Sequence, residues 1–129
     1  MKKSEITIAG KSVTLCYCYA TEIAFKTLAE RDINDFWLEA VPQLREQRMP
    51  DVRQTIFLLL ASITAYYNSL DEQAPVTDKD LMNEATPTEL GTALGTVMRL
   101  RGEFYAVPVD EPADEPADKP TKGRKRKNA

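Results

Sequence analysis

The sequence contains no histidine, and only two cysteines and five glycines in 129 residues. Histidine is the commonest general base and the commonest metal ligand, so its absence removes the usual centre of hydrolytic and metal-assisted chemistry. The glycines are scattered along the chain and therefore form no phosphate-binding loop. We expect no catalytic residue, no cofactor site and no metal site, and we interpret the protein as non-enzymatic.

The two cysteines, Cys16 and Cys18, stand two residues apart on a predicted strand. We expect the two thiols to point to opposite faces of the sheet and therefore not to bridge each other. Two thiols without histidine also make a poor zinc site. Because no secretory apolar segment follows Lys2 and Lys3, the expected location is the cytoplasm.

No apolar run is long enough to cross a membrane, which takes about 20 residues. The longest run, residues 52–70, is interrupted by Ser62 and Thr64, so it indicates the central helix of a soluble core. Its large apolar residues recur every three and four positions and cover more than one side, which predicts packing partners on several sides. These residues are Ile56, Leu59, Leu60, Ile63, Tyr66, Tyr67 and Leu70, widened by Phe57, Leu58 and Ala61.

Alternation of apolar and polar residues predicts an N-terminal β-hairpin over residues 5–19. Ala9, Gly10 and Lys11 form the expected turn, because glycine accepts the positive φ that a tight turn requires. A two-stranded hairpin is marginally stable alone, so its apolar face should pack on helices or pair with another chain.

A short helix should follow the hairpin. Thr21 is placed to cap it, with Glu22 as its first residue and Phe25 near the edge of its buried face. The inner face is predicted to consist of Ile23, Ala24, Thr27 and Leu28.

A second helix is predicted before the polar break at residues 45–50. Asn34 is placed to cap it, and Ile33 should contact Leu38 as a hydrophobic staple. Pro42 lacks an amide donor and should kink this helix or begin a new turn.

Capping patterns predict two more helices after the central one. Thr77 and Asp80 indicate a short helix, and Thr86, Pro87 and Glu89 mark the start of a last helix that extends to about residue 105.

The last helix carries Gly91 and Gly95 one turn apart, and glycine weakens a helix, so we expect close approach to another helix there. Its inner face is predicted to consist of Leu90, Leu94, Val97, Met98 and Phe104.

The composition changes from Pro108 onward. A proline at every fourth position forbids a helix, and an acidic half is followed by a basic end. The predicted fold class is therefore α+β, mainly α: a β-hairpin packed on a small helical bundle in residues 1–107, with a disordered tail in residues 108–129. Fifteen of the 20 acidic and 11 of the 17 basic residues precede the tail, so the body is acidic and nucleic acid is an unlikely partner.

The N-terminal stretch Ile-Thr-Ile-Ala-Gly-Lys-Ser-Val-Thr-Leu leads into Tyr-Ala-Thr-Glu-Ile-Ala-Phe, helices and a charged C-terminus. In this order of parts the chain resembles the tail assembly chaperones of long-tailed phages and prophages, in the version of Bacteroides-type mobile elements. The resemblance implies a protein of the bacterial host cytoplasm that binds the tape-measure protein and promotes assembly of tail-tube subunits. It also implies self-association and absence from the finished particle.

Large aromatic residues exceed what one small core usually hides, which indicates a binding surface for a partner. The predicted surface is a groove between the central and last helices, with Trp37, Phe57, Tyr66, Tyr67, Met98 and Phe104 as candidate contacts. The alternative is a small nucleic-acid-binding or regulatory adaptor that uses the basic C-terminal tail. Deleting residues 108–129 discriminates the two, because only the adaptor would lose its partner. A third interpretation, a structural tail component, predicts that the protein is present in purified particles.

Overall fold

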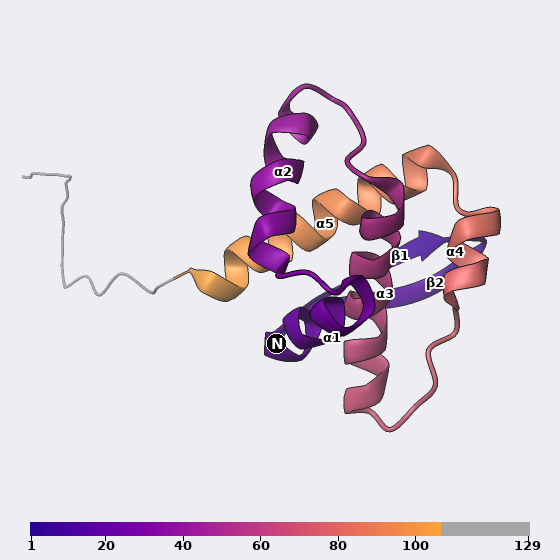
Figure 1. Cartoon of the computed structure of the whole chain (residues 1–129). Helices are drawn as coiled ribbons and strands as arrows, with labels where there is room; N and C mark the ends of the chain where they lie inside the picture. The colour runs from indigo at the N-terminus through magenta and orange to yellow at the C-terminus, as the bar shows by residue number, and fades with distance from the viewer. Residues whose placement is uncertain (107–129) are drawn as a thin grey trace, which may run out of the picture.

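A computed structural model describes residues 1–106 and shows an N-terminal β-hairpin followed by helices that pack around one core (Figure 1). The predicted α+β, mainly α, fold class is confirmed, whereas the predicted tail at residues 108–129 lies outside the described residues. The strands are β1 (Lys2–Ile8) and β2 (Lys11–Tyr17), and the helices are α1 (Tyr19–Ala29), α2 (Ile33–Arg45), α3 (Val52–Ser69), α4 (Asp78–Glu84) and α5 (Pro87–Tyr105).

The hairpin has the predicted turn. β1 pairs antiparallel with β2 so that Ile8 lies opposite Lys11. Ala9 and Gly10 between them have φ values of 52° and 74°, the positive values that a two-residue hairpin turn requires. The buried face of β2 consists of Val13, Leu15 and Tyr17, and the hairpin packs against α3 and α5.

The central helix is confirmed as α3, which runs through the middle of the molecule with α1 and α2 on one side and α4 on the other (Figure 1). The Asp51 carboxylate accepts a hydrogen bond from the Gln54 backbone N–H at 2.9 Å and caps the first turn. α3 packs against α1, β2, α4 and α5, which explains why its apolar residues are spread around the helix.

The junction between β2 and α1 is shorter than predicted. β2 ends at Tyr17, Cys18 is the N-cap, and α1 starts at Tyr19 rather than at Glu22. Cys18 therefore does not lie on the strand. The expected opposite orientation of the two cysteines is wrong, because residues two apart in extended backbone point to the same side, and both Sγ atoms lie 3.9 Å from the Thr21 hydroxyl oxygen. Both are free thiols, as predicted.

Thr21 is a buried residue of the first turn rather than the predicted cap. Its hydroxyl donates to the Cys16 carbonyl at 3.1 Å and accepts from the Cys18 amide at 3.3 Å. The side chain is fully buried and satisfies the backbone where the strand becomes a helix.

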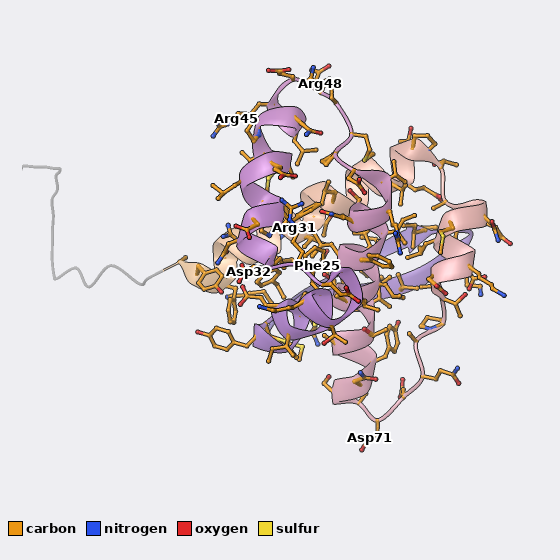
Figure 2. All side chains as sticks on the ribbon, in the orientation of Figure 1. Phe25, Arg31, Asp32, Arg45, Arg48 and Asp71 are labelled. Carbon is orange, nitrogen blue, oxygen red and sulfur yellow. The ribbon has the colours of Figure 1, made fainter. Side chains whose placement is uncertain are left out.

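The predicted inner face of α1 is wrong except at Ala24, which is partly buried against the core. Phe25 is fully buried, and its ring lies 5.6 Å from that of Phe36 on α2, among the packed side chains where α1 meets its neighbours (Figure 2). Ile23 is 68% exposed, and Thr27 and Leu28 are exposed too. A short helix with apolar residues on several sides has no unique buried face. The position of the preceding hairpin therefore determines which side of α1 packs against the core.

The start of α2 also differs from the prediction. The Asp32 carboxylate accepts a hydrogen bond from the Asn34 backbone N–H at 2.8 Å, so Asp32 is the N-cap. Leu38 is 76% exposed while Ile33 is buried, which rules out the predicted staple between them. The helix continues through Pro42 and ends at Arg45.

Both predicted capping boxes are present. The Thr77 hydroxyl accepts from the Asp80 amide at 3.2 Å, and the Thr86 hydroxyl accepts from the Glu89 amide at 3.1 Å. Glu89 Oε1 also accepts from the Ala9 amide at 3.3 Å, so the start of α5 is joined to the hairpin turn.

The glycines of α5 do not mark a close helix contact. A Cβ atom at Gly91 would lie 3.9 Å from the Met49 side chain, an ordinary contact, and nothing lies within 4 Å of one at Gly95. The predicted inner face is correct for Leu90, Leu94 and Val97, whereas Met98 is 39% exposed and Phe104 is only half-buried.

Candidate interaction surface

The six predicted contact residues do not line one groove. Tyr66 and Tyr67 pack edge-to-face on α3, with ring centroids 5.0 Å apart. Trp37 is buried on α2 beside Phe36, and Phe57 lies half-buried on α3 beside Arg53.

Tyr67, Phe104 and Met98 from the predicted set lie in different places. The Tyr67 hydroxyl accepts from the Thr14 amide at 3.3 Å, so this ring helps hold β2. Phe104 packs edge-on against Tyr19, with ring centroids 5.1 Å apart. Met98 is exposed on α5. The predicted set is therefore distributed over the molecule.

The side of the molecule formed by α1, α2 and the end of α5 carries two adjoining concavities. The first, of about 470 Å³, lies between α1 and the start of α2 and is bordered by Ile23. The second, of about 420 Å³, lies between α2 and α5 and is bordered by Leu38. Asn34 lines both, so the two adjoin. We call them together the α1–α2 surface; Figure 1 shows these two helices next to each other.

Ile23 and Leu38 are the functional candidates that the sequence analysis missed, because both were assigned to internal contacts. At 3.6 residues per turn, Leu38 lies about 140° around the helix from Ile33, well off the buried stripe. That stripe consists of Ile33, Phe36, Trp37 and Ala40. The offset of Leu38 from it was a usable signal for exposure.

The second concavity, which we call the Trp37–Arg101 pocket, is bordered by an arginine whose guanidinium group lies near two aromatic rings. The Arg101 guanidinium lies 5.7 Å from the Trp37 ring centroid and 5.6 Å from that of Tyr105. Arg101 also donates to Asn34 Oδ1 at 3.3 Å. The rest of the lining is aliphatic and consists of Leu38, Val41 and Pro42.

A shared carboxylate joins the end of α5 to α1. Glu22 Oε2 accepts from the Tyr17 hydroxyl at 2.8 Å and from the Tyr105 hydroxyl. Burial, followed by the neighbouring Glu22, raises the pKa of Tyr17, and the hydrogen bond to Glu22 raises the pKa of Tyr105 to about 12. Both phenols stay protonated at neutral pH and act as hydrogen-bond donors that hold α5 in place.

The two thiols differ in exposure. Burial raises the pKa of Cys16 to about 11, whereas Cys18 is partly exposed at the start of α1. Within residues 1–106 no group of three or more cysteine or acidic residues is arranged to hold a metal ion.

Alkylation with iodoacetamide at pH 8 should therefore modify one thiol of the folded protein quickly. We expect Cys18 to react at least about 100-fold faster than Cys16. The Cys16 side chain is inaccessible, and its pKa of about 11 leaves roughly 1% of the thiolate that an ordinary thiol would have. Mass spectrometry of peptides over time measures the two rates. Equal rates in the native protein would contradict the buried position of Cys16, and equal rates in urea serve as the control.

No helix of the described residues combines the length and apolar character needed to span a bilayer. Searches with this chain found no matching protein-family model, curated protein or solved structure.

Proposed function

We propose that this protein is a phage or prophage tail assembly chaperone that acts in the cytoplasm of the bacterial host. Its client is the tape-measure protein, whose apolar helical stripes it covers while tail-tube subunits assemble. The resemblance of the N-terminal sequence suggests the family, and the observation that carries the binding role is the exposure of two branched aliphatic side chains, Ile23 and Leu38, beside adjoining concavities.

The chemistry of the α1–α2 surface suits an amphipathic helix. Single exposed apolar residues are ordinary on protein surfaces. Here, however, the two aliphatic side chains border two adjoining concavities that also have polar residues in their lining, among them Lys26 and Asn34. An apolar centre with a polar rim is the usual composition of a protein interface, and a groove between helices commonly accepts another helix.

Replacing both aliphatic residues with aspartate should release the client. Burying two such side chains contributes about 3 kcal/mol or more, so Ile23→Asp with Leu38→Asp should weaken binding by roughly 100-fold. The measurement is capture of co-expressed tape-measure protein on the tagged chaperone, followed by titration with the purified client segment.

The control replaces two other exposed apolar residues outside this surface, Leu70→Asp with Met82→Asp, which are 47% and 53% exposed in the wild type. This variant should keep its client. Equal capture by the wild type and the Ile23/Leu38 variant, with unchanged circular dichroism, would show that the surface is not the binding site.

A further inference from the structure

The two strands of the hairpin differ in how their outer edges are bonded. On β2, the Thr14 backbone N–H donates to the Tyr67 hydroxyl at 3.3 Å, and the Cys16 carbonyl accepts from the Thr21 hydroxyl at 3.1 Å. The edge of β2 is therefore joined to α3 and α1. These bonds also show that the backbone groups of Thr14 and Cys16 point away from β1, because in an antiparallel pair they alternate between facing the other strand and facing outward.

The register then gives the outward groups of β1. Glu5 lies opposite Thr14 and Lys3 lies opposite Cys16. Two residues opposite each other either exchange both backbone hydrogen bonds or both point outward. The backbone N–H and C=O groups of Lys3, Glu5 and Thr7 therefore point away from β2. Among the described residues 1–106, none of these groups is hydrogen-bonded to another element.

This unpaired edge, which we call the β1 edge, is open to other molecules. Lys3, Glu5 and Thr7 are exposed. Ile6, which points to the other side of the strand, is only partly buried, although its cross-strand partner Val13 is 1% exposed. An exposed row of unpaired N–H and C=O groups is a template for a further strand.

The charges on the β1 edge are complementary to a second copy of the same edge. Lys3 and Glu5 lie on one face of the strand, and neither forms an ion pair with another described residue. When two β1 edges pair antiparallel about a two-fold axis at Ser4, each Lys3 lies opposite Glu5 of the other copy, and these residues point their backbone groups at each other. The two adjacent registers that keep the backbone groups facing would place Lys3 opposite Lys3 or Glu5 opposite Glu5, and like charges in these positions repel.

We propose that two copies of this chain associate through their β1 edges, with Lys3 of each copy paired with Glu5 of the other. The two hairpins then form one antiparallel sheet in the order β2–β1–β1–β2. A two-stranded hairpin is marginally stable by itself, whereas four strands make a sheet of ordinary size. The same edge is used by both copies, so the association closes at a dimer. The inference rests on the hairpin alone, and its test requires no client, so it is independent of the proposed chaperone function.

Charge reversal tests the pairing, with dimerisation of the full-length chain measured by analytical ultracentrifugation at low salt. Lys3→Glu and Glu5→Lys each replace two attractive pairs with two repulsive ones, so each variant should dimerise about 10- to 100-fold more weakly than the wild type. An equal mixture of the two variants should associate like the wild type, because position 3 then faces a position 5 of opposite charge. The matched controls Lys79→Glu and Glu84→Lys make the same charge changes at exposed positions of α4 and should leave dimerisation unchanged.

Amide hydrogen exchange of the ¹⁵N-labelled wild type identifies the surface. The Lys3 and Glu5 amides should exchange at least about 10-fold more slowly in the dimer than after dilution to the monomer. The Ile6 amide, which faces β2, should be protected in both and serves as the internal control. Circular dichroism checks the fold of each variant, and the double substitution Lys3→Glu with Glu5→Lys, which restores both pairs, should dimerise like the wild type.

Four results would each overturn the proposal. They are a wild type that stays monomeric up to its solubility limit, folded single variants that dimerise as tightly as the wild type, a mixture and a double variant that associate no better than the single variants, and a dimer in which the Lys3 and Glu5 amides remain unprotected.

Discussion

Phe25→Ala should destabilise the protein by about 3–5 kcal/mol, the range for removing a buried aromatic side chain and leaving a cavity. Phe25 is fully buried, and its ring packs on Phe36, so the substitution removes the contact between α1 and α2 as well as apolar burial against the core. Urea unfolding followed by circular dichroism measures the change in the free energy of unfolding. Because a small domain has only about 5–15 kcal/mol in total, this loss is a large share of the stability and should lower the urea midpoint clearly.

The control lies on the same helix two residues away. Ile23→Ala should change the free energy of unfolding by no more than about 0.5 kcal/mol, because Ile23 is 68% exposed. Similar effects of the two substitutions would contradict the orientation of α1 and would favour the inner face expected from periodicity alone.

Thr21→Val should cost about 1–3 kcal/mol although the two side chains have nearly the same shape. The substitution removes the hydroxyl that joins the Cys16 carbonyl to the Cys18 amide and leaves buried backbone groups without a partner. The same unfolding measurement detects the loss.

Thr21→Ser provides the comparison, because serine keeps the hydroxyl and loses only a methyl group. It should therefore be more stable than Thr21→Val despite being smaller and more polar. The opposite order would mean that Thr21 contributes through apolar packing and that its hydrogen bonds matter little.

Local signals predicted much of the architecture. The capping box at Thr86 and Glu89, the one at Thr77 and Asp80, and the turn at Gly10 were all correct. Each depends on residues within four positions of one another, so their chemistry can be evaluated before the rest of the fold is known.

The candidate surface was harder to predict. Apolar residues remain outside the core, as expected from the composition, but they are not the predicted aromatic set, of which Trp37 is buried. Ile23 and Leu38 are exposed because neighbouring elements cover other sides of α1 and α2. The contact of Arg101 with Trp37 was not predicted, because the sequence does not show that α2 lies beside the end of α5.

By itself, the sequence determined the number and type of elements, the start of most helices and the lack of histidine-based chemistry, since these follow from composition and short-range hydrogen bonding. Only the tertiary structure decided that Phe25 faces inward and Ile23 outward, and that Trp37 and Arg101 meet in one pocket. The physical reason is that helix periodicity allows several buried faces, and the packing of distant segments selects one of them.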